Sequence, residues 1–201
     1  MMKDKKTHGI QLLLRCVVRD PDGKVISDSG RKPAKSFVIQ FLEFIYAMFR
    51  GTGDVSVTAT DGTEDLIYDF QRTATTQFRV DAPINDSNYG VVVGTGDTAE
   101  DNTDNKLETQ LTEGESAGNI THASVVMVFA TVVGANVDLE VKRAFTNGTG
   151  STITVKEAGI YTRYSHTGPY YHCIIRDVLP APIEVPDKCS LAVIYTIRTT
   201  V

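Results

Sequence analysis

The sequence predicts a mainly β protein: an antiparallel β-sandwich, jelly-roll-like, with an N-terminal β-hairpin and one buried helix. Three observations favour this class. The second half of the chain is a series of segments rich in valine, threonine and aromatic residues, which are good strand formers. Residues typical of turns (Gly, Asn, Asp and Pro) separate these segments. No amphipathic helix pattern lies between them, so we expect neighbouring strands to be antiparallel.

Residues 1–54 are expected to elaborate this same domain with a hairpin and a helix. A strand at residues 10–18 and a returning strand at 24–27, joined by Asp-Pro-Asp-Gly, form the hairpin. The helix follows, with Ser36 as its expected N-cap, and ends at Gly51.

The expected helix is apolar on nearly all sides. Its polar residues Gln40, Glu43 and Arg50 leave one narrow polar stripe. A helix that is apolar nearly all round must be buried nearly all round, so we expect the domain's own sheet on one side and a neighbouring subunit on the other. The interface residues expected on this segment are Phe37, Phe41, Phe44 and Phe49.

Residues 55–201 are expected to form the sandwich. The expected strands are residues 55–59, 66–70, 77–80, 89–93, 121–133, 137–145, 152–164, 170–178 and 190–199. Turns are expected at residues 134–136, 147–148, 166–169 and in the proline-rich stretch 180–186. No composition shift marks a linker, so one β-domain is predicted.

The bulk composition excludes several function classes. A net charge of −5 gives no reason to expect nucleic acid as a partner. The start of the chain does not read as a signal peptide, and no apolar run is long enough to span a bilayer, so we expect synthesis in the cytoplasm and no membrane partner. The three cysteines, Cys16, Cys173 and Cys189, are odd in number and widely spaced, which argues against a disulfide framework.

The charge is unevenly distributed along the chain. Residues 1–35 hold nine Lys/Arg against four Asp/Glu, whereas residues 95–119 hold seven Asp/Glu against one lysine. Both segments can be solvated surfaces; alternatively, the basic arm of one copy docks on the acidic loop of the next. The residues expected in that docking are Lys3, Lys5, Lys6, Asp97, Glu100, Asp101 and Asp104.

The turn Gly94-Thr95-Gly96-Asp97-Thr98-Ala99 follows three valines and matches the dinucleotide fingerprint G-x-G-x-x-G/A. A phosphate site of that kind needs a helix N-terminus after the turn, but carboxylates follow here and they would repel phosphate. We therefore expect no nucleotide cofactor and interpret the glycines as turn residues, with positive φ angles allowed at the end of a strand.

No catalytic or metal-binding set is recognised. An EF-hand fails at Lys106 and Thr112, although a looser calcium site within residues 97–104 stays open. Neither a zinc motif nor a nucleophile elbow is present. Glu157 is interpreted as an outward or backbone-capping glutamate rather than a catalytic carboxylate. The chain is therefore not expected to be an enzyme or to hold a cofactor or metal.

Three segments carry a resemblance to a known class of proteins. They are VVVGTGDTAEDNTDNKLETQL (residues 91–111), AFTNGTGSTITVKEAGIY (144–161) and IIRDVLPAPIEVPDKCSLAVIYTI (174–197). In this order they resemble virion structural proteins of tailed bacteriophages, among them tail-fibre attachment domains and accessory proteins of the head or tail. The resemblance covers residues 89–201.

The resemblance implies an architectural role in the virion, with other copies of the chain and other virion proteins as partners. Because the chain ends on its last strand without a fibre shaft, a tail, collar or capsid-surface position is favoured. The alternative is a module that binds a host receptor or surface glycan, for which Tyr164, Tyr170 and Tyr171 could form an aromatic platform.

Overall fold

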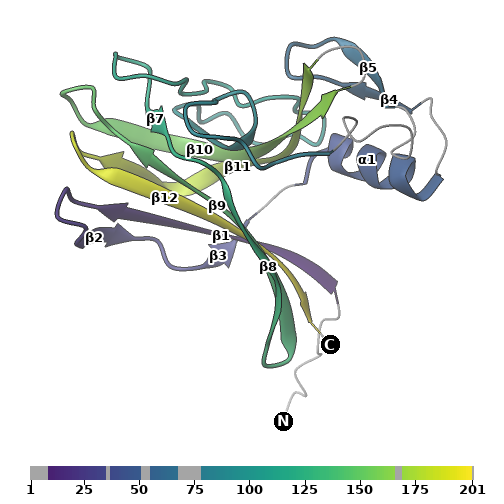
Figure 1. The fold of residues 1–201 in the computed structure, drawn as a ribbon, viewed down its shortest axis with the longest axis horizontal. Helices are drawn as coiled ribbons and strands as arrows, with labels where there is room; N and C mark the ends of the chain where they lie inside the picture. Colours follow the sequence, from purple (N-terminus) through teal and green to yellow (C-terminus); the bar gives the residue numbers. More distant parts are fainter. Residues whose placement is uncertain (1–8, 35–36, 51–54, 68–77, 166–168, 201) are drawn as a thin grey trace.

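A computed structural model describes residues 9–34, 37–50, 55–67, 78–165 and 169–200. It confirms a mainly β, antiparallel fold with one short helix (Figure 1). The larger sheet contains β1 (Gly9–Arg19), β2 (Val25–Asp28), β3 (Lys32–Pro33), β7 (Thr121–His122), β8 (Val126–Val133), β9 (Asn136–Thr146) and β12 (Ser190–Thr200). The smaller sheet contains β6 (Gly90–Gly94), β10 (Ile153–Ser165) and β11 (Pro169–Val185).

The larger sheet has the order β2-β1-β12-β9-β7, with β3 also on β1 and β8 also on β9. Strand β1 pairs along its whole length with β12, from Gly9 opposite Thr200 to Arg19 opposite Ser190. The N-terminal hairpin is thus built into the same sheet as the last strand of the chain. In the smaller sheet, β10 lies between β11 and β6.

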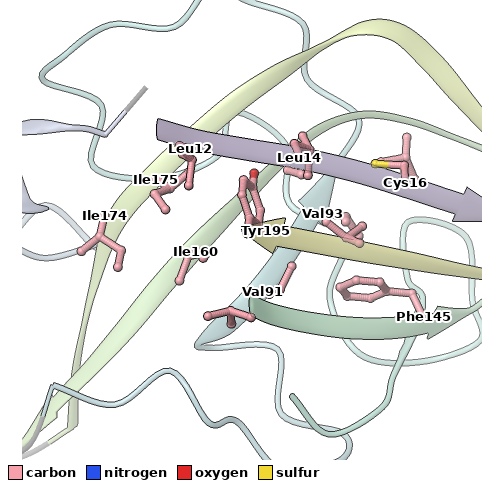
Figure 2. Close-up of a cluster of buried hydrophobic side chains, with 14 of the residues drawn as sticks. Leu12, Leu14, Cys16, Val91, Val93, Phe145, Ile160, Ile174, Ile175 and Tyr195 are labelled. Atoms are coloured by element: carbon pink, nitrogen blue, oxygen red, sulfur yellow. The ribbon is translucent and has the colours of Figure 1, made fainter. Parts of the chain in front are cut away.

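The main core lies between the two sheets. Along much of β1 and β12, buried residues alternate with less buried ones, so that one face of the larger sheet meets the smaller sheet. Figure 2 shows this layer, in which Leu12, Leu14 and Tyr195 of the larger sheet lie near Ile160 and Ile175 of the smaller one. This is the sandwich that the sequence predicts. The three cysteines are unpaired, and all three are buried.

Helix α1 (Ile39–Arg50) and the hairpin of β4 (Val55–Thr58) and β5 (Glu64–Ile67) lie at one end of the molecule (Figure 1). The helix contacts β4 and β11. The expected N-cap Ser36 and the expected stop Gly51 fall outside the described residues.

Two strand predictions and one turn prediction are corrected. Residues 78–80 form only an isolated bridge, Arg79 with Arg163. The expected long strand 121–133 is divided into β7 and β8. The proline-rich stretch belongs to β11 instead of forming a turn, because Pro180 and Pro182 lie where the β10–β11 pairing skips from Ile183 to Val178, and a missing N–H there removes no ladder hydrogen bond.

Candidate interaction surface

The glycine turn holds an anion, but the anion is the chain's own Glu157. This side chain is fully buried on β10. Its carboxylate accepts N–H bonds from Gly96 at 3.2 Å, Glu108 at 3.0 Å and Thr109 at 2.8 Å. The guanidinium of Arg176 also donates to it, at 3.2 Å. The expected backbone-capping role of Glu157 is therefore confirmed, whereas the expected outward position is wrong.

The glycines of this turn are needed because the backbone approaches closely. A Cβ on Gly94 would lie 2.5 Å from both the Glu157 Oε1 and the carbonyl oxygen of Thr109, and one on Gly96 would lie 2.7 Å from the same Oε1. Neither glycine has a φ in the left-handed region, so the expected positive φ is wrong at both positions. Glu157 occupies the space in which a phosphate would have to sit.

The acidic loop uses its carboxylates within the chain. Asp104 forms an ion pair with Arg176 at 2.6 Å, and Glu100 accepts the N–H of Val178 at 2.8 Å. Asp101 accepts the N–H of Thr103, again at 2.8 Å. This loop is therefore fastened to β11 through its own side chains and is not a set of unsatisfied anions.

At the exposed end of this loop, Asp97 forms an ion pair with Lys156 at 2.8 Å, which lowers the pKa of its carboxyl. In the described residues, no group of three or more His, Cys, Asp or Glu side chains is placed to hold a metal ion. Residues Lys3, Lys5 and Lys6, expected to dock on this loop in a neighbouring copy, lie outside the described residues, so that docking stays a prediction.

The buried Arg143 was not identified as important from the sequence. The guanidinium of Arg143 donates to five backbone carbonyl oxygens, those of Ala123, Tyr89, Val91, Pro83 and Asp86. Burial lowers the pKa of Arg143 to about 10. This arginine fastens the irregular segment before β6 to the larger sheet.

His172 of β11 is fully buried, with its ring edge-on to Phe44 and its Nε2 3.5 Å from the Asp65 carboxylate. Burial lowers the pKa of His172 to about 4 and raises the pKa of Asp65 to about 6. Because solvent does not reach the imidazole, these two side chains offer no open site for a substrate.

The helix exposes a different face from the one expected. Phe44 is fully buried against Phe78 and His172 of its own chain, so it is a core residue and not an interface residue. Phe37 and Phe41 stack at 4.2 Å and are half-buried, and the Phe49 side chain lies outside the described residues.

Of the polar stripe predicted for the helix, Gln40 does not face solvent, Glu43 is half-buried, and the Arg50 side chain lies outside the described residues. Gln40 is buried, while Ile39, Leu42, Tyr46 and Met48 are exposed. The helix therefore leaves apolar side chains uncovered, as the excess of apolar residues suggested, but on residues other than the phenylalanines named from the sequence.

The aromatic platform expected for glycan binding is incomplete. Tyr164 is fully buried, and Tyr171 stacks on Tyr89 with ring centroids 6.1 Å apart. Only Tyr170 of the three keeps part of its ring accessible without such a stacking partner among the described residues.

The most exposed apolar surface lies on the β8–β9 hairpin, residues 126–141, which we call the arm. Figure 1 shows the arm extending past the smaller sheet beside the first residues of β1 and the last of β12. Gly134, with φ of 63°, makes the tight turn that joins the strands. Phe129 is 88% exposed and Val132 is 77% exposed, fractions that are rare for large apolar side chains in a folded chain.

The two faces of the arm follow from its register. Residues that pair directly across an antiparallel ladder share a face. Met127 pairs with the core residue Val141, and Val132 pairs with Val137, so these side chains continue the core face of the larger sheet. At this end the smaller sheet no longer covers them.

The opposite face of the arm carries a network of ion pairs. There Asp138 forms ion pairs with Arg198 at 2.6 Å and Arg31 at 3.4 Å, and Arg31 also pairs with Glu140 at 2.8 Å. The uncovered apolar side chains therefore lie on the core-facing side, at Met127, Val132 and Val137. Val126 and Val133, at the two ends of β8, are exposed on the outer face.

The uncovered surface is large for a single chain. Its exposed members are Ile10, Val126, Met127, Phe129, Val132, Val133 and Val137. Counting about 150–200 Å² for a full side chain of this size gives roughly 700 Å² of exposed apolar surface. This area, summed over both faces of the arm and Ile10, approaches the ~800 Å² that each partner buries in a stable interface.

No helix in the described residues has the length and apolar character that crossing a bilayer requires. Comparisons with protein families, with curated proteins and with solved structures find no match to this chain. The resemblance to phage virion proteins is therefore still a prediction.

Proposed function

We propose that this protein is a non-enzymatic structural subunit of a tailed-phage virion, present in many copies in the tail, collar or capsid surface. It would be made in the host cytoplasm and built into the particle through contacts with its own copies and with other virion proteins. The single observation that carries the proposal is the uncovered apolar surface of the arm.

The physical argument is one of burial. Apolar surface exposed to water costs about 25 cal/mol per Å² relative to its buried state. The arm and the start of β1 together expose seven apolar side chains, so association with another chain is favoured over a solitary chain. The exposed residues Ile39, Leu42 and Tyr46 of α1 add a second apolar surface. Two separate surfaces on one chain are what a subunit needs to join more than one neighbour.

The interior of the molecule is suited to a structural role, because buried polar groups connect distant segments of the chain. The buried polar groups Glu157, Arg176 and Arg143 each bind backbone or carboxylate groups of distant segments. They hold long loops in one conformation. The resemblance in residues 89–201 supplies the virion context.

The proposal is tested by mass spectrometry of purified particles of the phage that encodes the chain. We expect the protein in a constant ratio to the major capsid protein after gradient purification. A phage protein that is not part of the particle serves as the control. Finding the chain abundant in infected-cell lysate but missing from purified particles would refute the virion role.

A further inference from the structure

We infer that two copies of this chain pair through the edges of their β8 strands, antiparallel and about a two-fold axis, so that the two larger sheets become one continuous sheet. The inference rests on the proposed assembly role and names the surface and the partner: a second copy of this chain. Four observations on β8 and its neighbours carry it.

The first observation is that β8 has an unpaired edge. It pairs with β9 on one side, and in the described residues no backbone hydrogen bond joins residues 126–133 to any other segment. The N–H and C=O groups on that side are therefore available to a further strand.

The second observation is that β8 lacks most of the features that prevent edge pairing; of these it has only a bulge between Val128 and Thr131. Its sequence, VMVFATVV, contains no charged residue and no proline over eight residues. Natural sheets protect their edges with lysine, proline, short strands or covering segments. An eight-residue neutral edge is instead suited to strand addition.

The other sheet edges in the described residues are protected. Strand β11 carries Pro180 and Pro182 along part of its length and is bridged by Phe37 at Ile175. The outer edge of β6 is covered by residues 109–111. The remaining edge strands are four residues long or shorter: β2, β3, β4, β5 and β7.

The third observation is that β8 is complementary to itself. An antiparallel register that uses all eight residues places Val126 opposite Val133 of the second copy, Met127 opposite Val132 and Val128 opposite Thr131. The pairing to β9 puts Met127 and Val132 on the core-facing side and the other four on the outer side. Every pair therefore joins residues of the same face, as an antiparallel ladder requires.

The bulge in β8 makes this match possible. The register to β9 shifts between Val128 and Thr131, so Phe129 and Ala130 together lie opposite the single residue Leu139, and β8 has one extra residue at its centre. In the two-fold pair each Phe129 lies opposite the partner's Ala130, a large side chain against a small one. Without the shift, residues 126 and 133 would lie on opposite faces and the full register would fail.

The fourth observation is the match of charge and area. Because the strand is neutral, pairing it with itself brings no like charges together, and the exposed surface of about 700 Å² suits one side of a stable interface. Association through this surface depends weakly on salt, whereas docking of a basic arm on the acidic loop would weaken strongly as salt rises.

A disulfide experiment with two single variants tests the pairing. In one chain, residues 126 and 133 lie about 20 Å apart along the strand, whereas in the proposed dimer they face each other at the ~5 Å separation that a disulfide accepts. The variants Val126→Cys and Val133→Cys are mixed in equal amounts, allowed to exchange and oxidised. The native cysteines are buried, so the oxidised wild type is the background control.

We expect a covalent dimer from the mixture, reaching about half of the chains, the share of mixed dimers in a random exchange, and no dimer from either variant alone. Circular dichroism checks that both variants fold. Sedimentation of the wild type is measured in parallel, at low and high salt.

Each other result overturns the inference in a different way. A wild type that associates, with no cross-link in the mixture, refutes the β8 pairing and leaves the assembly role in place. Cross-linking of either variant with itself shows a different register or parallel pairing. A monomeric wild type without cross-links in the mixture refutes both this pairing and self-association.

Discussion

Replacing Glu157 by alanine is expected to destabilise the fold severely without touching any apolar contact between the sheets. The substitution removes the acceptor for three backbone N–H groups and for Arg176. Arg176 keeps its ion pair with Asp104. Removing one member of a buried, hydrogen-bonded ion pair costs about 3–5 kcal/mol, and we expect the free energy of unfolding to fall by that amount.

The measurement is urea and thermal unfolding followed by circular dichroism, because the chain has no tryptophan. A loss of about 3–5 kcal/mol corresponds to a drop in Tm of roughly 6–20 °C for a protein of this size. Glu184→Ala is the matched control: this glutamate is exposed on β11 and accepts only the hydroxyl of Thr154. Its loss is expected to cost less than about 0.5 kcal/mol.

Hydrogen exchange gives a second readout of the same variant. The amides of Glu108 and Thr109 donate to the Glu157 carboxylate, so they should lose protection in Glu157→Ala before the central strands do. If Glu157→Ala unfolds within about 1 kcal/mol of Glu184→Ala, the idea that this carboxylate fastens the glycine turn and the acidic loop is refuted.

Three further predictions concern the same interior. Gly96→Ala should cost about 1–3 kcal/mol, because the new Cβ would lie 2.5 Å from the Cβ of Glu108, whereas Gly9→Ala, which meets nothing within 4 Å, should be near neutral; equal melting temperatures would contradict this. Arg143→Met should lower the free energy of unfolding by about 3–5 kcal/mol by leaving five carbonyl groups without their donor, and a loss below about 1 kcal/mol in urea would count against it. Burial lowers the pKa of His172 to about 4, below the value of ~6.5 in the unfolded chain. This histidine therefore stabilises the fold above pH 6.5 and loses that contribution as pH falls toward 4. Burial raises the pKa of Asp65 to about 6, so proton uptake by Asp65 opposes the loss of stability at low pH. Asp65→Asn should therefore make stability fall more steeply as pH is lowered, and a shallower fall would be inconsistent with these directions.

The strand pattern of this fold could be predicted from sequence because its long strands are β-branched and separated by turn residues. The failures have local causes. Pro180 and Pro182 read as a turn, although a skipped stretch of pairing accommodates them within β11. Residues 78–80 have strand composition, but only Arg79 finds a backbone partner.

The candidate surface was harder to predict. From the sequence we expected more apolar surface than one chain can bury, and we assigned it to residues that include Phe44. Phe44 instead lies in the domain's own core, whereas Leu42 and Tyr46, which were not named, are exposed. Helical periodicity gives the angle between side chains, not the direction in which the core lies. A signal for the arm was present in VMVFATVV, because a strand apolar on both faces is unexpected at the edge of an antiparallel sheet.

The role of Glu157 could be predicted only in part. Its position before Ala-Gly on a strand suggested backbone capping, but the segments that it binds lie 48 to 61 residues away in sequence. The sequence shows the glycines and the glutamate separately. Only the fold shows that the glycines make room for the carboxylate.

The most direct measurement is the mass of the full chain in solution, by native mass spectrometry over a range of concentrations. We expect the wild type to form homo-oligomers and Val132→Glu, which puts a charge on the core-facing side of the arm, to be a monomer. Ile26→Glu, at a residue of β2 that is 48% exposed at the opposite edge of the larger sheet from β8, should associate like the wild type. A wild type that stays monomeric, or a Val132→Glu variant that associates as well as the wild type, would contradict the claim that the arm is where copies of this chain meet.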